Sequence, residues 1–147
     1  MKRPLILLLI LIAAFLLSCV PDAEGQVRVV RVIDGDTIEI EGGARVRYIG
    51  IDTPEVYPQT KYYGPEAWAK NRELVEGKVV TLEKDVTEAD AYGRLLRYVY
   101  VDGVFVNGEL VRLGYARAIS YPPDTKYQER LAQFEEEARG ARRGLWR

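Results

Sequence analysis

The chain has 147 residues, of which 48% are hydrophobic and 29% charged, which is enough apolar material for one modest core in one domain. Its formal net charge of -1 lacks the strong positive charge of proteins that bind nucleic acid by charge alone, so any nucleic-acid site must be local. Histidine is absent and Cys19 is the single cysteine, which excludes histidine-based catalysis, histidine-ligated metals, multi-cysteine zinc sites and internal disulfides.

The first 18 residues have the pattern of an export signal. Lys2 and Arg3 precede an unbroken apolar run at residues 5–17. As a helix this run would span roughly 20 Å, against a hydrocarbon core of about 30 Å, so a membrane-spanning anchor is disfavoured. We therefore predict a signal peptide at residues 1–18.

The end of this run, Leu16-Leu17-Ser18-Cys19, resembles a bacterial lipobox and predicts lipidation of Cys19. The alternative is a plain signal peptide followed by a coincidental cysteine. We predict a tether at residues 19–26 and one domain at residues 27–147. The protein is then exported, and it is either secreted or attached to a membrane by a lipid at Cys19.

The chain after the tether favours β-strands. Residues 27–33 are rich in valine, and residues 37–41 alternate apolar and acidic side chains. Gly42-Gly43 indicates a hairpin turn before a third strand at residues 44–51. Strict alternation would place Arg47 and Asp52 on opposite faces of a straight strand, so a bend near Gly50 is needed to aim both at one site.

Helices and two further strands follow. A helix is predicted from Gly64-Pro65 to Glu76, with Trp68, Leu74 and Val75 facing the core. Strands are predicted at residues 78–84 and 94–101, a short helix from an N-cap at Asn107 to Gly114, and a last helix after a capping box at Thr125 and Gln128. This order fits an α+β, mainly β fold: a five-stranded Greek-key barrel of the OB-fold type with three helices.

Three motifs place chemical groups where the chain turns: Asp34-Gly35-Asp36-Thr37, Ile51-Asp52-Thr53-Pro54-Glu55 and Tyr92-Gly93-Arg94. Converging carboxylates can hold a hard cation, and arginines can grip a phosphate. Asp36, Asp52 and the backbone carbonyl of Thr53 are the candidate metal ligands. This chemistry does not separate Ca²⁺ from Mg²⁺ or Mn²⁺, and the alternative for Asp-Gly-Asp alone is a hairpin turn with solvated acids.

In their order and spacing, these motifs resemble the staphylococcal nuclease family from about residue 27 to residue 146. The resemblance implies an OB-fold, a Ca²⁺ ion, and cleavage of DNA and RNA that leaves 3′-phosphate and 5′-hydroxyl ends. It also implies that Glu55 activates the attacking water and that Arg47 and Arg94 contact the phosphate. Asp34 is expected to orient the ligands or a water molecule.

Tyr92 and Tyr121 are candidates for stacking on a nucleotide. The alternative for each is a half-buried barrel tyrosine. The sequence departs from the family pattern at Ala91, which replaces a lysine, and in a two-tyrosine segment that is reduced to Tyr121. Arg45 and Arg97 are expected to be solvated surface arginines.

We predict a monomeric, exported, Ca²⁺-dependent endonuclease with DNA and RNA as substrates. Two alternatives are a non-catalytic nucleic-acid or protein binding module on the same fold and a purely structural envelope lipoprotein. The joint presence of two candidate ligands, a candidate base and two arginines favours the enzyme. These residues are Asp36, Asp52, Glu55, Arg47 and Arg94.

Overall fold

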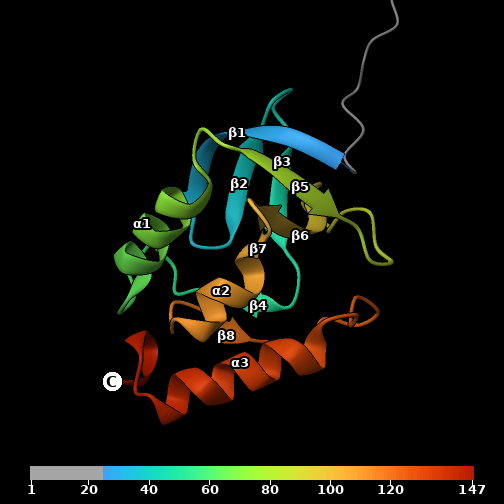
Figure 1. The fold of residues 1–147 in the computed structure, drawn as a ribbon. Coiled ribbons are helices and arrows are strands. Elements are labelled where there is room, and N and C mark those ends of the chain that lie inside the picture. The colour runs from blue at the N-terminus through green and yellow to red at the C-terminus, as the bar shows by residue number, and fades with distance from the viewer. Residues whose placement is uncertain (1–24) are drawn as a thin grey trace, which may run out of the picture.

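The computed structural model describes residues 25–147, so the predicted signal peptide, Cys19 and most of the predicted tether lie outside the described residues. Eight strands, three α-helices and one short 3₁₀ helix follow one another in the described part of the chain (Figure 1). In chain order they are β1 (Gly25–Asp34), β2 (Thr37–Ile40), β3 (Arg45–Tyr48), β4 (Ile51–Asp52), α1 (Gly64–Val75), β5 (Val79–Glu83), β6 (Leu95–Val101), β7 (Val104–Phe105), α2 (Val106–Arg112), β8 (Arg117–Ala118), α3 (Gln128–Gly140) and η1 (Gly144–Trp146).

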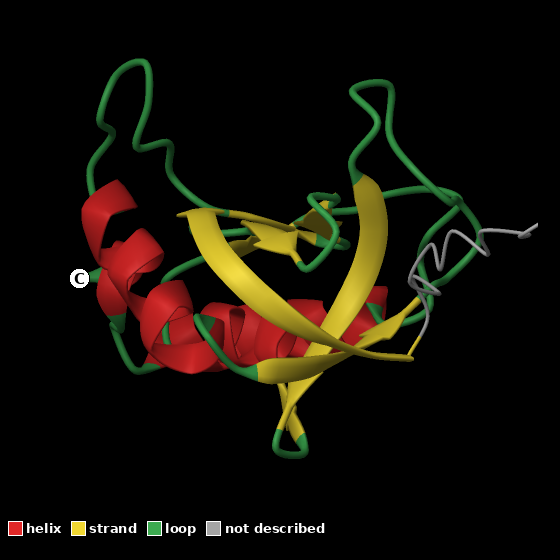
Figure 2. Cartoon of the chain, turned by 90° about the horizontal axis from the view of Figure 1, so that it is seen from above, coloured by secondary structure: helices red, strands yellow, loops and turns green. Residues whose placement is uncertain are grey.

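Five strands form a closed barrel. β1 pairs antiparallel with both β2 and β5, β2 pairs with β3, and β5 pairs with β6. A parallel pairing of β3 with β6, in which Val46 lies opposite Leu95, closes the ring. Figure 2 shows the strands curving around the barrel with helices packed against one side. The predicted five-stranded barrel with three helices is confirmed.

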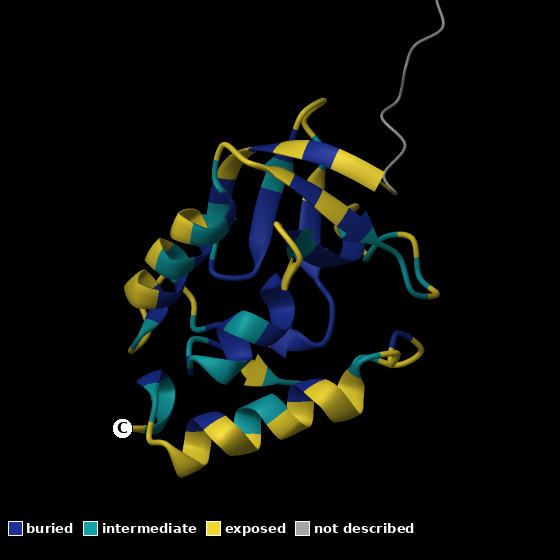
Figure 3. Ribbon diagram, viewed as in Figure 1, coloured by how far each residue is buried: buried dark blue, intermediate teal, exposed yellow. Residues whose placement is uncertain are grey.

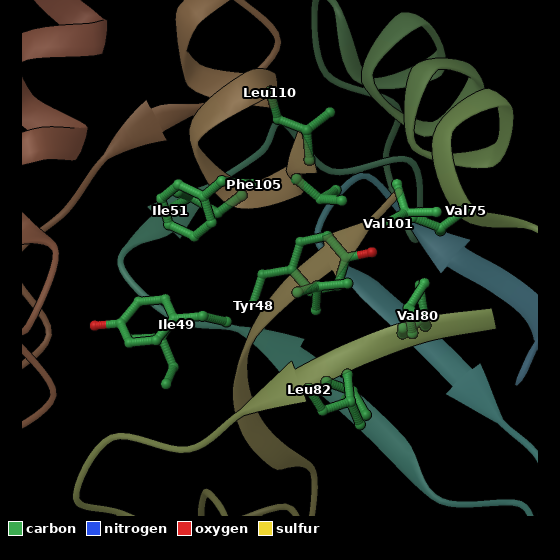
Figure 4. Packing of buried hydrophobic residues seen from close by; sticks show 14 of the residues in the cluster. Tyr48, Ile49, Ile51, Val75, Val80, Leu82, Val101, Phe105 and Leu110 are labelled. Atoms are coloured by element: carbon green, nitrogen blue, oxygen red, sulfur yellow. The ribbon is translucent and has the colours of Figure 1, made fainter. Parts of the chain in front are cut away.

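The core fills the barrel and the layer between the barrel and the helices (Figures 3 and 4). Ile38 and Ile40 of β2 are buried, as their alternation with acidic residues predicts. On α1, Val75 is fully buried, while Trp68 and Leu74 pack against the core with partial exposure. No helix among residues 25–147 is both long enough and apolar enough to cross a membrane.

Both helix starts predicted from capping residues are wrong. α2 begins at Val106, and Asn107 is buried inside it, where its amide accepts from Val99 N and donates to Ile49 O, each at 2.9 Å. α3 begins at Gln128 after Tyr127, and no side chain caps it. At Asn107, two buried backbone groups, one in β6 and one in the turn after β3, need a partner, and this requirement outweighs the local capping preference.

Arg97 is a buried side chain, and its prediction as a surface arginine is wrong. Its Nη1 donates to Glu88 O at 3.0 Å and Leu96 O at 2.8 Å, and its Nη2 lies 2.5 Å from Glu88 Oε1. The parallel ladder places Arg97 opposite Tyr48, on the closed seam of the barrel. Arg97 therefore ties the loop before β6 to that seam.

Candidate active site

The bend that would aim Arg47 and Asp52 at one place is present. Gly50 adopts a φ of 75°, a conformation that favours glycine, and it separates β3 from β4. After the bend, β4 leaves the barrel and pairs with β8. Arg47 Nη2 then lies 3.2 Å from Asp52 Oδ1.

The Arg47 guanidinium is held in a nearly buried position, and only 8% of the residue is exposed. Its Nη1 donates to Tyr48 O and Ile51 O, each at 2.9 Å, and lies 3.1 Å from Asp36 Oδ2. Since these partners come from both sides of the bend, Arg47 holds the bend and links two candidate ligands. These contacts fix the orientation of the guanidinium before any substrate binds.

Asp36 is a buried carboxylate at the centre of this arrangement. Its Oδ2 accepts from Thr53 N at 2.9 Å, and its Oδ1 accepts from the Thr37 hydroxyl at 3.2 Å. Burial, together with the nearby Asp34 carboxylate, raises the pKa of Asp36 to about 7, against the opposing effect of Arg47. A bound cation would favour the ionised form of this carboxylate.

The two acidic motifs pack directly against each other at Gly35. A Cβ atom at this position would lie 2.6 Å from Thr53 Oγ1, so a larger residue would force the two turns apart. Asp34 Oδ1 accepts from Asp36 N at 3.0 Å and closes the turn around Gly35. In this structure Asp34 fixes the position of Asp36.

Sequence reasoning missed Asn71 on α1, which is fully buried. Its Nδ2 donates to Asp34 O at 3.0 Å, and its Oδ1 accepts from the Tyr48 hydroxyl at 2.9 Å. Asn71 therefore connects α1 to the first acidic turn and to β3. Its helical spacing from Trp68 and Val75 puts a polar residue on the apolar face of the helix, which is the signal that could have found it.

Asp52, Thr53 and Glu55 line one open hollow of about 300 Å³. The Asp52 side chain is 53% exposed, and Glu55 is exposed on the loop that follows β4. The half-exposed candidate ligand and the candidate base therefore reach the same solvent-filled space. A water molecule or a phosphate group can enter it without any movement of the barrel.

Arg94 lies in a different hollow of about 310 Å³, which it lines together with Arg45 and Tyr92. Its Nε is 2.7 Å from Asp90 Oδ2, and Asp90 Oδ1 accepts from the backbone N–H groups of Arg94 and Tyr92. Burial alone would raise the pKa of Asp90, but these hydrogen bonds outweigh it and hold the pKa below its ordinary value. The structure thus joins Arg94 to Asp90 and not to the hollow of Glu55.

The two candidate stacking residues differ in exposure. Tyr92 is 86% exposed, and the Arg94 guanidinium lies 5.5 Å from the centre of its ring. Tyr121 is partly buried and packs against the core. The loop between β5 and β6, which carries Tyr92, lies beside the loop between β8 and α3, which carries Tyr121 (Figure 1). Two hydrogen bonds join these loops, from Val86 N and Thr87 N to Asp124 Oδ1. Tyr92 offers the free ring face that stacking requires.

The candidate metal ligands are few. Within residues 25–147, no three acidic, cysteine or histidine side chains gather into a cluster that could hold a metal ion. The candidate set is two carboxylates, Asp36 and Asp52, joined through Arg47, with Thr53 packed beside Asp36. These are oxygen donors of the type that Ca²⁺ and Mg²⁺ prefer, and both ions also accept water and substrate oxygens. The donor set fits a hard cation that completes its coordination from solvent or phosphate.

Comparisons with known proteins identify relatives of this chain over most of its length. A family model described as "Staphylococcal nuclease homologue" matches residues 45–147. The chain is 40% identical over 129 residues to the thermonuclease of Staphylococcus hyicus, an alignment that covers 84% of this chain and 76% of that protein. It is 40% identical over 132 residues to the thermonuclease of Staphylococcus intermedius, covering 85% and 79%. Endonuclease YncB of Bacillus subtilis (strain 168) is 41% identical over 124 residues, which cover 79% of this chain and 59% of that protein.

Proposed function

Because this chain belongs to the staphylococcal nuclease family, we propose that it is a Ca²⁺-dependent nuclease that hydrolyses phosphodiester bonds inside DNA and RNA. The observation that carries the proposal is the Arg47 guanidinium, which lies 3.1 Å from Asp36 and 3.2 Å from Asp52 beside the hollow that Glu55 lines. Two oxygen ligands, a phosphate-binding arginine and a general base are the groups that hydrolysis of a phosphodiester needs.

In the proposed reaction, Glu55 accepts a proton from a water molecule whose oxygen attacks phosphorus. The bond from phosphorus to the 5′-oxygen breaks, the 5′-oxygen takes a proton from solvent, and the products are a 3′-phosphate and a 5′-hydroxyl. Arg47 stabilises the negative charge that develops on the phosphoryl oxygens. Asp36, Asp52 and the Thr53 carbonyl would hold the ion, which supplies positive charge beside the phosphate.

Arg94 contributes a second guanidinium. Its Nε is occupied by Asp90, and its two terminal nitrogens remain for the phosphate. We assign it to the developing charge on the attacked phosphoryl group, with Tyr92 beside it as a stacking surface for a base. Tyr121 stays a weaker candidate for the nucleotide because it is partly buried.

We also propose that the protein is exported as a monomer and is anchored by a lipid at Cys19. The support for export and for the lipid anchor is the sequence at residues 1–19, which lies outside the described residues. One buried acyl chain gives only reversible membrane binding, so firm anchoring requires more than one chain.

The test is digestion of end-labelled single-stranded DNA and RNA with Ca²⁺, with Mg²⁺, and with excess chelator. We expect cleavage of both substrates with Ca²⁺, no cleavage in chelator, and DNA fragments that a polymerase extends only after their 3′-phosphate is removed. Full activity in chelator would contradict the metal assignment. A folded protein that binds the DNA and cleaves it under none of these conditions would support the non-catalytic binding module instead.

A further inference from the structure

Three residues outside the catalytic set line the same hollow as Asp52 and Glu55: Lys61, Tyr62 and Arg117. Lys61 and Arg117 are exposed, and Tyr62 is 72% exposed. Of the ion pairs that the described residues form, none includes Lys61 or Arg117. Two cationic groups and an aromatic ring therefore face solvent together, and among the described residues neither cation forms an ion pair.

Arg117 is held next to Asp52 without pairing with it. The β4–β8 ladder places the two residues directly opposite each other, so their side chains stand on the same face. Asp52 pairs with Arg47 instead, while the Arg117 guanidinium lies over the Trp146 ring, 4.9 Å from its centre. The C-terminal segment also supplies Leu145 to the hollow. Trp146 thus supports an arginine that remains available to a ligand.

Lys61 reaches the hollow on the loop that carries Glu55. Its backbone N donates to Glu55 O at 2.9 Å, so the loop folds back and brings its far end beside the candidate base. The hollow is consequently assembled from three separate segments of the chain, at residues 52–62, residue 117 and residue 145. Such a site does not arise from one flexible surface loop.

The second hollow, formed by Arg45, Tyr92 and Arg94, has the same chemistry, with two arginines and one exposed tyrosine. The two hollows share no lining residue. Arg45 and Arg94 both line the second hollow and directly precede the first pair of the parallel β3–β6 ladder. Arg47 follows two residues along β3, and it contacts Asp52. The hollows therefore lie at the two ends of a row of residues that passes through the candidate ligands.

We propose that Lys61, Tyr62 and Arg117 form a second nucleic-acid subsite, which binds the phosphate and base on the side of the scissile bond away from Arg45 and Tyr92. The ammonium and guanidinium groups bind the phosphate, and the tyrosine ring stacks on the base. Because the whole chain carries a net charge of -1, such local cations must supply the attraction for a polyanion. This inference rests on the proposed nuclease function.

The test uses thymidine dinucleotides that have one cleavable linkage and one extra terminal phosphate, at either the 5′ or the 3′ end. Each extra phosphate is expected to raise kcat/KM of the wild type about tenfold over the plain dinucleotide, the effect of one charge-assisted contact. In Lys61→Gln/Arg117→Gln the gain from one terminal phosphate disappears, and in Arg45→Gln the gain from the other disappears. The gain is measured within each variant, as the ratio of its kcat/KM with and without the terminal phosphate, so a change in cleavage of the plain dinucleotide does not enter the comparison.

The matched control is Arg28→Gln, an exposed arginine on the distant half of β1 that pairs with Glu41, and it should keep both gains. Loss of the same gain in the Lys61/Arg117 and Arg45 variants, or loss of neither, would overturn the subsite. If the wild type cleaves no substrate, the proposed function fails. Fluorescence anisotropy with a labelled oligothymidylate then tests the subsite alone, and equal affinity of the wild type and the Lys61→Gln/Arg117→Gln variant would overturn it.

Discussion

Asp36 and Arg47 form an ion pair, with 3.1 Å between Asp36 Oδ2 and Arg47 Nη1, and both side chains are almost completely buried. The pair joins the turn before β2 to the end of β3, and the same guanidinium continues to Asp52. A buried pair of this kind is costly to break, because the remaining partner stays desolvated and unpaired. The candidate active site is therefore also a structural centre of the barrel.

Replacement of Arg47 tests this dual role. Arg47→Ala leaves Asp36 buried without its cation and removes the donors to Tyr48 O and Ile51 O. We expect the free energy of unfolding at pH 8 to fall by about 3 kcal/mol and nuclease activity to be lost. Urea denaturation followed by circular dichroism gives the first quantity. A loss below about 1 kcal/mol would show that the pair is not structural.

Arg94 distinguishes catalysis from binding. If its terminal nitrogens stabilise the attacked phosphate, Arg94→Ala lowers kcat about 10²–10³-fold with a smaller change in KM. Arg94→Lys also stays poor, because an ammonium cannot reproduce the two-pronged contact or its geometry with Asp90. Both constants are measured on one oligonucleotide.

The control for Arg94 must be an exposed arginine. Arg97 is unsuitable because it is buried and bonded to Glu88, so its loss would disturb the fold. Arg28→Ala is the appropriate comparison and should change kcat little. Equal, small effects at Arg94 and Arg28 would favour the non-catalytic binding module.

The hydrogen bonds of Glu83 are expected to make a pH-dependent contribution to the free energy of unfolding. Burial raises the pKa of Glu83, but hydrogen bonds from Lys126, Tyr127 and Tyr100 outweigh it and bring the pKa below 4.5. A lowered folded-state pKa stabilises the protein above the unfolded-state value of about 4.5, and this contribution disappears as pH falls through the folded-state pKa.

Glu83→Gln should therefore reduce the free energy of unfolding by about 1–2 kcal/mol at pH 7 and by much less at pH 3. Urea denaturation of both proteins at the two pH values measures the difference. Lys84 is the next residue along the chain, and Lys84→Gln controls for the loss of any charge at this edge. A Glu83→Gln effect that is equal at pH 7 and pH 3 would contradict the assignment.

The lipid anchor rests on sequence alone and has its own test. Cys19→Ala should release the protein from membranes or leave the signal peptide uncleaved, because no thiol remains to accept the lipid. Mass spectrometry of the mature wild-type N-terminus should show a modified Cys19. A mature protein that begins with an unmodified residue other than Cys19 would end the proposal.

The sequence predicted the fold where local chemistry decides it. The alternation of Ile38 and Ile40 marked a strand face, and glycine marked the bend at Gly50. It did not show the parallel closure of β3 on β6, because that contact depends on distant segments. The same closure buries Arg97, whose sequence neighbours give no sign of its burial.

The candidate site was predictable in part. The two acidic motifs were recognisable by their spacing, but their packing at Gly35 and the link through Asn71 required the structure. The pairing of Arg94 with Asp90 was also invisible, since a short loop offers many acids to one arginine. Asn107 was misassigned because local capping preference cannot register two distant buried groups that need a partner.

The central claim is that hydrolysis takes place in the hollow that Asp52 and Glu55 line, with Glu55 as the base. The most direct measurement is the single-turnover cleavage rate of Glu55→Gln, with oligonucleotide and Ca²⁺ affinity determined in parallel. Glu66→Gln is the matched control, an exposed glutamate in the first turn of α1. The account predicts a rate about 10²–10⁴-fold below wild type for Glu55→Gln, with unchanged affinities and a wild-type rate for Glu66→Gln. Equal rates for the two variants would contradict it.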